Sequence, residues 1–348
     1  MFALLYGKEY EEKYTHFFVD KRRENGELMN YFCTLFDSNY LTRGLALYDS
    51  LENTGAPFML YVFAFDDLVA DILDKLSFAH LTVIRLQEFE DERLLAVKST
   101  RSRGEYCWTC SSFSILYVLR NFNVPEVTYL DSDLYFFQSS QILLDEFHAS
   151  DKDVLITSHR YTPEYDQSAT SGIYCVQFMT FRNTENGLRV LNWWCDRCEE
   201  WCYNRLEDGK FGDQKYLDDW PTRFPGMIHE LKHIGGGVAP WNIQQYSCTE
   251  GPTVDGKPVV FYHFHQLQWL NLHTFDLSSY RLSPEAIRYI YLTYLDALQE
   301  ALKIVRDTYD PAFSKGFAAK EHGIPARLRH YKSVVARILR GGYNVVRR

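Results

Sequence analysis

The sequence lacks any long apolar run. No stretch approaches the roughly 18 to 20 consecutive apolar residues that a membrane-spanning helix requires. The first nine residues are too short and too soon acidic to form a signal peptide. Basic residues do not predominate either, because the formal net charge is −9, which argues against a general nucleic-acid-binding protein. These features predict a cytoplasmic protein.

Glycine-rich phosphate loops and zinc-binding cysteine patterns are also missing. No GxGxxG or Walker-type loop follows the first predicted strand, so the ordinary dinucleotide-binding and P-loop classes lack their fingerprint. Of the eight cysteines, Cys107 and Cys110 form one group and Cys195, Cys198 and Cys202 another. The two groups lie too far apart in the sequence for a compact zinc module. We expect buried structural thiols.

The 348 residues show the regular alternation of an α/β protein. Apolar residues make up 46% of the chain and charged residues 24%, as in ordinary globular domains. Strands alternating with helices predict βαβ units and a mainly parallel sheet that is covered on both faces. The expected strands are residues 31–36, 58–65, 81–84, 127–130, 154–156, 173–179 and 259–264, and the expected helices are residues 40–51, 68–76, 90–97, 107–122 and 188–206, with a further helix capped by Ser283.

Two carboxylates, Asp131 and Asp133, directly follow the predicted strand at residues 127–130. Residues at i and i+2 of an extended backbone point to the same side, so both side chains can converge on one object. Unpaired, the two charges would repel each other. Oxygen ligands of this kind suit Mg²⁺ or Mn²⁺. The pattern therefore predicts a divalent metal site at the sheet edge, although the same triplet also occurs by chance on solvated loops.

The segment Tyr129-Leu-Asp-Ser-Asp-Leu134 resembles the metal-binding YLDxD signature of GT-A glycosyltransferases, and most closely of glycosyltransferase family 8. The resemblance covers about residues 30–272. It implies a Rossmann-like GT-A catalytic domain at residues 28–272, preceded by an extension at residues 1–27 and followed by a helical region at residues 273–348. It also implies a nucleotide-sugar donor, with Mn²⁺ or Mg²⁺ as the cofactor.

Carried over from the resemblance, the nucleotide would be held by the first loop. Phe36-Asp-Ser-Asn-Tyr40 is similar to the segment in which the family binds uracil and ribose. Asp37 would then accept from the uracil N–H, Asn39 would lie near the sugar of the nucleotide, and Tyr40 would stack on the base. Ser132, between the two metal-binding carboxylates, is counted with these residues.

Two further segments resemble family motifs. Phe211-Gly-Asp-Gln-Lys-Tyr-Leu217 is similar to the segment that faces the transferred sugar, which implies Asp213 for a sugar hydroxyl and Gln214 beside the anomeric carbon. Tyr262-His-Phe-His265 is similar to the segment that supplies the third metal ligand. That ligand would be His263, with His265 in reserve.

The chain also departs from the family pattern. The family's NAG strand corresponds here to Cys175-Val-Gln177, and Gln266 and Gln268 replace the Gly and Lys that usually follow the late histidine. The usual basic residue in the helix before the metal motif has no clear counterpart. The basic residues just upstream are the candidates to reach the diphosphate instead: Lys98, Arg101 and Arg103.

Each candidate has a structural alternative. Asp37 can start a turn, Asp213 can cap the turn that follows it, and His263 can be a satisfied core histidine. In the glycine-rich segment at residues 235–242, Trp241 fits either a sugar platform or the core.

The C-terminal segment combines basic residues from Arg327 to Arg348 with an apolar stripe, marked by Leu328 and Ile338, at helical spacing. This pattern predicts a basic amphipathic helix. Such a helix fits either an anionic membrane surface or a docking site on the catalytic domain.

These observations predict a metal-dependent, hexosyltransferase-like enzyme of polysaccharide biosynthesis, attached peripherally to the inner face of the membrane. It would transfer a sugar from a UDP-sugar to a hydroxyl of a glycan or lipid-linked glycan, with retention implied by the resemblance. The rival hypotheses are a sugar-phosphate nucleotidyltransferase and a catalytically silent sugar-binding protein on the same scaffold.

Overall fold

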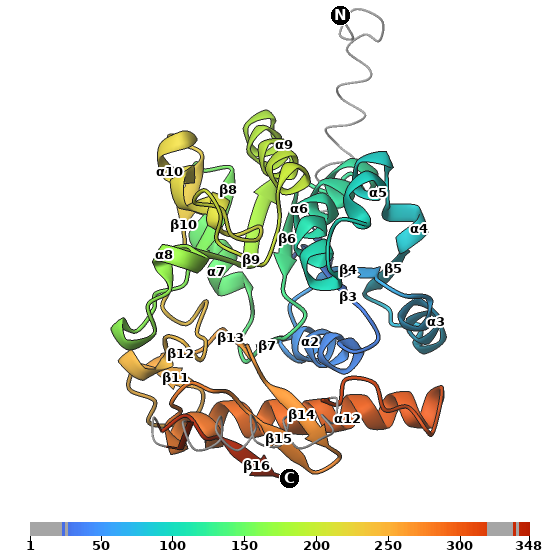
Figure 1. Ribbon diagram of the computed structural model, residues 1–348, viewed down its shortest axis with the longest axis vertical. Coiled ribbons are helices and arrows are strands. Elements are labelled where there is room, and N and C mark those ends of the chain that lie inside the picture. The colour runs from blue at the N-terminus through green and yellow to red at the C-terminus, as the bar shows by residue number, and fades with distance from the viewer. Residues whose placement is uncertain (1–22, 25–26, 319–336, 339–340) are drawn as a thin grey trace, which may run out of the picture.

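The computed structural model describes residues 23–24, 27–318, 337–338 and 341–348, and its central feature is a seven-stranded sheet (Figure 1). The strand order is β10-β8-β9-β6-β3-β4-β5. Strands β6, β3, β4 and β5 are parallel, as are β10 and β8, whereas β9 runs antiparallel to both of its neighbours. The predicted α/β class with a mixed, mainly parallel sheet is confirmed. The strands are β3 Asn30–Phe36, β4 Phe58–Ala64, β5 Leu81–Arg85, β6 Glu126–Leu130, β8 Val154–Ser158, β9 Tyr174–Arg182 and β10 Ile228–Glu230.

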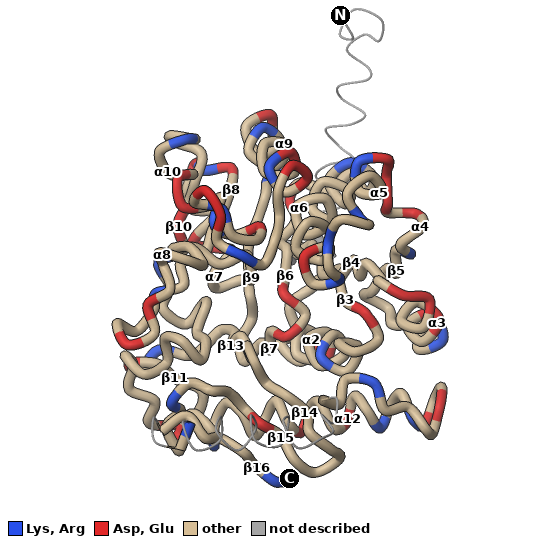
Figure 2. The backbone as a smooth tube through the Cα atoms, viewed as in Figure 1, with Lys and Arg blue, Asp and Glu red and all other residues tan. Residues whose placement is uncertain are grey.

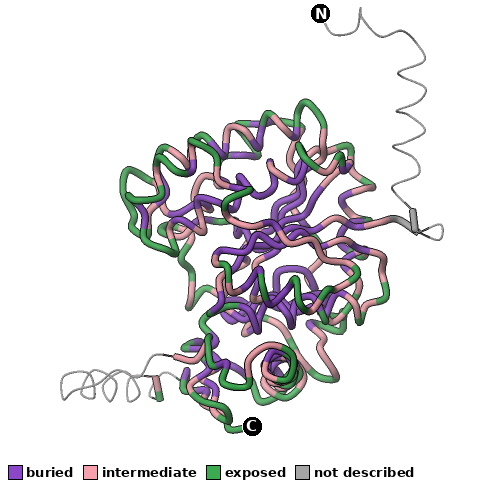
Figure 3. Tube along the Cα trace, turned by 90° about the vertical axis from the view of Figure 1, so that its right-hand side faces the viewer, coloured by how far each residue is buried: buried purple, intermediate pink, exposed green. Residues whose placement is uncertain are grey.

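Helices cover both faces of this sheet because its strands are apolar on both sides. Along β3, Phe32 packs into one core cluster and Cys33 into the other, and the same alternation continues along β4. Figure 3 shows the buried residues concentrated in the interior of the described chain. One face carries α2 Leu41–Asn53, α3 Asp67–Leu76 and α7 Gln141–His148, and the other carries α6 Arg103–Asn121 and α9 Glu185–Glu200.

Several helix boundaries differ from the predicted ones. Helix α6 begins at Arg103 instead of residue 107, because Ser102 and Glu105 form a capping box. Helix α9 ends at Glu200, where Trp201 adopts an extended conformation, so the helix does not reach residue 206. The helix predicted at residues 90–97 corresponds to α5 Glu92–Lys98, and a separate short helix, α4 Leu86–Phe89, precedes it. The cysteines at residues 33, 110, 175, 195, 198 and 202 are buried and those at 107 and 248 are half-buried.

The C-terminal part lies along the bottom of Figure 1, beneath α2, against which its long helix packs. Ser283 caps the predicted helix, which is divided into α11 Pro284–Ala286, a π-helical turn at Ile287–Tyr291 and α12 Leu292–Thr308. Three strands, β14 Gln268–Asn271, β15 Thr274–Asp276 and β16 Val345–Arg347, form a small antiparallel sheet beside it. The division of the chain at residues 27 and 272 stays a prediction.

Most of the predicted basic helix, at residues 319–336 and 339–340, lies outside the described residues. Of its described members, Arg337 donates two hydrogen bonds to Asp276, and Arg348 forms an ion pair with Asp296. Acidic and basic residues are interspersed over the described elements, and acidic residues mark the chain between β6 and β7 (Figure 2). No described helix has the length and apolar character needed to cross a bilayer.

Short elements complete the described chain and carry much of the site. Strand β7, Leu134–Phe136, follows Asp133 directly and pairs antiparallel with β13, Phe261–His263. The others are β1 Arg23–Glu24, β2 Glu27–Leu28, η1 Pro163–Tyr165, α8 Ser168–Ser171, η2 Lys215–Asp219, α10 Trp220–Arg223, η3 Ile243–Gln245, β11 Thr253–Val254 and β12 Lys257–Pro258.

Candidate active site

A cavity of about 700 Å³ opens where β3 and β6 end. In parallel sheets, ligands bind beyond the carboxyl ends of the strands, and this cavity lies at that edge. It brings together ten of the residues that the sequence predicts for the site, namely Asp37, Tyr40, Arg103, Asp131, Ser132, Asp133, Asp213, Gln214, His263 and His265.

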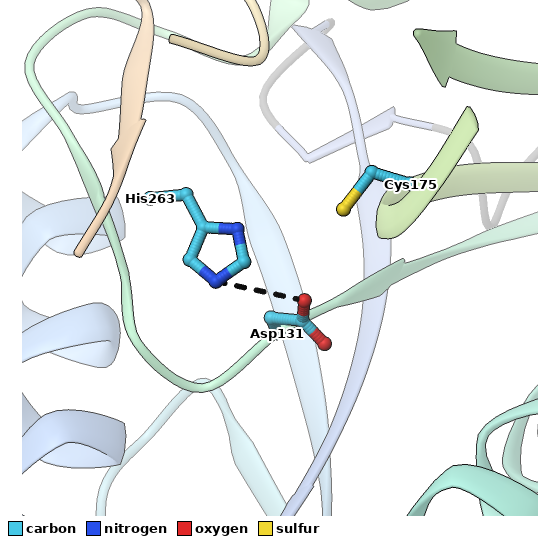
Figure 4. A group of neighbouring side chains, drawn as sticks. All are labelled: Asp131, Cys175 and His263. Atoms are coloured by element: carbon cyan, nitrogen blue, oxygen red, sulfur yellow. Dashed lines mark ion pairs between the residues drawn. The ribbon is translucent and has the colours of Figure 1, made fainter. Parts of the chain in front are cut away.

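The two carboxylates after β6 converge on His263, but not through an extended backbone. The chain turns at this point, because the Leu134 N–H donates to the Asp131 carbonyl at 3.2 Å. Strand β7 then pairs with β13 so that His263 lies opposite Leu134. As a result, His263 Nε2 is 3.2 Å from Asp133 Oδ1 and 3.9 Å from Asp131 Oδ2 (Figure 4 draws Asp131 and His263). The predicted convergence therefore arises from a turn and a strand pair.

Gln177 on β9 fixes the orientation of the His263 ring. Its Oε1 atom lies 2.8 Å from His263 Nδ1 and can accept the proton that Nδ1 carries. The Nε2 atom then faces the two carboxylates. Metal-binding histidines usually have one ring nitrogen held by a hydrogen bond of this kind, which leaves the other nitrogen free for the metal. In the sequence, Gln177 stands where the chain departs from the family's NAG strand, and no role was predicted for it.

The charges around His263 are consistent with a cation site. Burial raises the pKa of the Asp131 carboxyl. Burial also acts to raise the pKa of Asp133, but the charge and hydrogen bond of His263, together with the charges of His265 and Arg43, outweigh burial and the pKa falls. Burial acts to lower the His263 pKa, but the charge and hydrogen bond of Asp133, together with Cys175 and Asp131, outweigh burial and the pKa rises well above its ordinary value. A proton on His263 thus balances the carboxylates in the metal-free protein, and a divalent ion bound by two carboxylate oxygens and Nε2 can take its place.

In the first loop, Asp37 both stabilises the turn before α2 and forms an ion pair with Arg103. Its Oδ1 atom accepts from the Asn39 N–H at 2.8 Å, so Asp37 does organise the turn before α2. Its Oδ2 atom lies 2.7 Å from Arg103 Nε. Tyr40 is partly exposed, with the Arg43 guanidinium 4.6 Å from its ring centroid, and Asn39 is exposed outside the cavity lining. Asp37 and Tyr40 thus face the cavity, whereas Asn39 does not line it.

The upstream basic residues differ in where they lie. Arg103 lines the cavity at the first position of α6. Lys98 pairs with Glu90 at 2.6 Å, and the Arg101 guanidinium lies 4.0 Å from the Tyr203 ring centroid. Neither Lys98 nor Arg101 is part of the cavity lining.

Asp213 and Gln214 form the opposite wall, between α9 and η2. The Asp213 carbonyl accepts from Trp194 Nε1 at 2.9 Å, and Gln214 occupies the N-cap position of η2. Burial, followed by the charge of Asp131, raises the pKa of the Asp213 carboxyl to about 7. Gln214 Nε2 donates to the Ser171 carbonyl at 2.8 Å.

Aromatic side chains that sequence reasoning did not assign complete the cavity. Trp241 is buried, donates from Nε1 to the His159 carbonyl at 2.9 Å, and packs edge-on against His263. His159 stacks on Tyr161 with ring centroids 4.6 Å apart. The sequence carried a signal only for Trp241, through the glycines before it. At Gly237, with φ +79°, an added Cβ atom would meet protein side chains, so the glycines permit close packing within the protein.

Comparisons with solved structures find distant likenesses. They include the galactosyltransferase LgtC with donor and acceptor sugar analogs, which is 12% identical with a TM-score of 0.49 over 78% of this chain and 95% of that chain. Mouse xyloside xylosyltransferase 1 is 14% identical with a TM-score of 0.43, and the alignment covers 69% of this chain and 98% of that chain. The glycosyltransferase GlyE of Streptococcus pneumoniae TIGR4 is 15% identical with a TM-score of 0.45, covering 84% and 66%. These similarities are too low to assign an activity.

Comparison with known sequences places the chain more firmly. No family model matches it. Two proteins of Bacillus subtilis (strain 168), the uncharacterized proteins YfnD and YfnF, are 30% identical over 308 residues and 29% identical over 302 residues. The alignments cover 85% of this chain and 96% of YfnD, and 83% of this chain and 98% of YfnF. With this identity over nearly the whole of YfnD, the chain belongs to the YfnD family.

Proposed function

We propose that this protein is a metal-dependent glycosyltransferase that moves a sugar from a UDP-sugar to a hydroxyl of a glycan or lipid-linked glycan. The observation that supports this most directly is the meeting of Asp131, Asp133 and His263 in one cavity at the carboxyl edge of the sheet. The cavity volume of about 700 Å³ lies in the range that small-molecule sites occupy.

In this proposal Asp131, Asp133 and His263 hold Mn²⁺ or Mg²⁺. Once bound, the ion would offset the charge of the departing diphosphate. Gln177 keeps His263 Nε2 directed at the carboxylates. Ser132 lies between the two carboxylates on the same cavity wall and can bond a phosphate oxygen.

The nucleotide is assigned to the first loop. Asp37 would accept from the uracil N–H, Tyr40 would stack on the base, and Asn39 would approach the sugar of the nucleotide from the loop surface. Arg103 already pairs with Asp37, so it is the basic residue placed to be shared between the base site and the diphosphate. Lys98 and Arg101 point to Glu90 and Tyr203 instead.

The transferred sugar is assigned to the wall formed by Asp213 and Gln214. With a pKa of about 7, the Asp213 carboxyl can donate or accept a hydrogen bond to a sugar hydroxyl at neutral pH. Gln214 is fixed by its bond to Ser171 and would line the reacting face beside the anomeric carbon. His265, 5.8 Å from His263 between ring centroids, remains the reserve metal ligand.

The test is to titrate UDP by calorimetry with and without Mn²⁺. We expect Mn²⁺ to strengthen UDP binding to the natural protein, and Asp133→Ala to remove that effect. Asp307→Ala, which changes an exposed carboxylate on α12, is the matched control. Folded protein that binds UDP equally well with and without metal would contradict the proposal.

Mass spectrometry of a nucleotide-sugar panel separates the rival hypotheses. A transferase should hydrolyse its donor slowly to UDP and free sugar, with retained configuration if the family resemblance extends to the chemistry. A nucleotidyltransferase should instead make nucleotide sugar from a sugar phosphate and release pyrophosphate. A silent sugar-binding protein should show neither reaction and no metal-dependent UDP affinity.

We also propose that the basic C-terminal segment attaches the protein to the inner face of the membrane. Deleting residues 325–348 should weaken binding to vesicles that contain anionic lipid. Because Arg337 and Arg348 form ion pairs with Asp276 and Asp296, the residues before Arg337 would carry most of this attraction. Unchanged vesicle binding would reject the attachment and leave the enzymatic proposal intact.

A further inference from the structure

A thiol lies beside the proposed metal ligands. Cys175 comes from β9, is 4% exposed and lines the cavity. One ligand atom from each of Asp131, Cys175 and His263 lies within 4.8 Å of the other two (Figure 4). Among the described residues, no other group of three or more His, Cys, Asp or Glu side chains meets this criterion.

Strand pairing explains why the thiol faces this group. The Asp131 N–H donates to the Gln177 carbonyl at 3.1 Å, so β6 and β9 remain joined up to the metal site. Cys175 and Gln177 are two residues apart on β9, and alternate residues of a strand point to the same face. Gln177 holds the His263 ring from that face, and Cys175 lies beside it.

Two overlapping donor sets result. Asp131, Asp133 and His263 offer two oxygens and a nitrogen, which suit Mn²⁺ or Mg²⁺. Asp131, Cys175 and His263 offer an oxygen, a sulfur and a nitrogen, the donors that Zn²⁺ takes in tetrahedral sites. Ligand atoms around a tetrahedral zinc lie about 3.5 Å apart. Small side-chain rotations of roughly 1 Å would bring this group to that spacing.

We propose that Cys175, Asp131 and His263 form a Zn²⁺ site that excludes Mn²⁺ from the neighbouring oxygen-rich set. The two sets share Asp131 and His263, so both ions cannot be held at once. Zinc binding releases to solvent both the Cys175 thiol proton and the additional proton that His263 carries in the metal-free protein, and it leaves the fourth position open. The competition with Mn²⁺ rests on the proposed function, whereas the zinc site itself does not.

Cobalt substitution tests the zinc site without any enzyme assay. Co²⁺ bound to a thiolate gives a near-ultraviolet charge-transfer band, and we expect the natural protein to show it and Zn²⁺ to bleach it. Cys175→Ser should lose the band and bind Zn²⁺ at least about 10-fold more weakly, since even outer partners of metal ligands change affinity by about that factor. Cys107→Ser is the matched control, because Cys107 lines the same cavity but lies outside the ligand group.

The outcomes separate the two proposals. Two results would overturn the zinc site. One is a cobalt charge-transfer band that survives in folded Cys175→Ser protein. The other is a natural protein that binds Zn²⁺ but gives no charge-transfer band when Co²⁺ replaces it. Competition is read from the electron paramagnetic resonance signal of free Mn²⁺, and one equivalent of Zn²⁺ should release bound Mn²⁺. Cys175→Ser should need about 10-fold more zinc for the same release. A thiolate band without metal-dependent UDP binding would keep the zinc site and reject the transferase.

Discussion

Replacing Asp213 by Asn is expected to stabilise the folded protein at pH 8. Asp213 is 5% exposed, and burial raises the pKa of its carboxyl from 3.8 to about 7. A raised pKa means that the folded state disfavours the charged form. Asn has nearly the same shape and carries no charge, so the variant removes this unfavourable term without opening a cavity.

The pH dependence follows from the direction of the shift. Between about pH 4 and pH 7 the folded state binds more protons at Asp213 than the unfolded state does, so the free energy of unfolding falls as the pH rises. The rise from 3.8 to about 7 corresponds to about 4 kcal/mol at roughly 1.4 kcal/mol per pH unit. We expect Asp213→Asn to raise the free energy of unfolding by on the order of 2–4 kcal/mol at pH 8 and to leave it almost unchanged at pH 4.

Urea unfolding followed by circular dichroism at pH 4.5, 6 and 8 measures this difference. Asp307→Asn, an exposed substitution on α12, should leave the unfolding free energy unchanged within about 0.5 kcal/mol at each pH. An Asp213→Asn variant that is no more stable at pH 8 than the natural protein would refute the charge argument. The same variant should transfer sugar poorly if Asp213 binds the donor, a trade of activity for stability.

Three further predictions concern other parts of the fold. Gln177→Leu should weaken Mn²⁺ binding by about 10- to 100-fold, read by paramagnetic resonance, because the imidazole of His263, which we propose binds the metal, loses its orienting partner. Gly237→Ala should lower the free energy of unfolding by at least about 2 kcal/mol, because an added Cβ would lie 2.6 Å from a threonine methyl. Gly226 has a similar φ but open space around it, so Gly226→Ala should lower the free energy of unfolding by only about 1 kcal/mol. Arg337→Ala should cost about 1–3 kcal/mol, because Asp276 is left largely buried without its partner, and thermal unfolding at pH 7 would show a lowered Tm.

The sequence was sufficient for the layers of the fold because its local signals agree with one another. Strands such as Phe58–Ala64 are apolar on both faces, and only a sheet covered on both sides buries them. The start of α6 was missed although Ser102 and Glu105 have the spacing of a capping box, since the polar residues around them carry no apolar period. Helix ends depend on such single contacts and are harder to read than helix cores.

The candidate site divides in the same way. The paired carboxylates were found because two charges next to a buried strand are unusual in any sequence. The places of Gln177, Cys175 and His159 depend on the register between β6 and β9 and on the loop that carries Trp241. Register is a property of paired strands, so one strand read alone does not reveal which of its residues will face a partner.

The pairing of β13 with β7 has a consequence for how the protein is assembled. His263 enters the site from a segment 130 residues after Asp133, and no local stretch of chain contains all three side chains. An ion held there would link the turn after β6 to β13, which belongs to the last third of the polypeptide. A chain truncated before β13 would keep both carboxylates and lose the imidazole, so metal binding by all three side chains would require a chain that extends at least to His263.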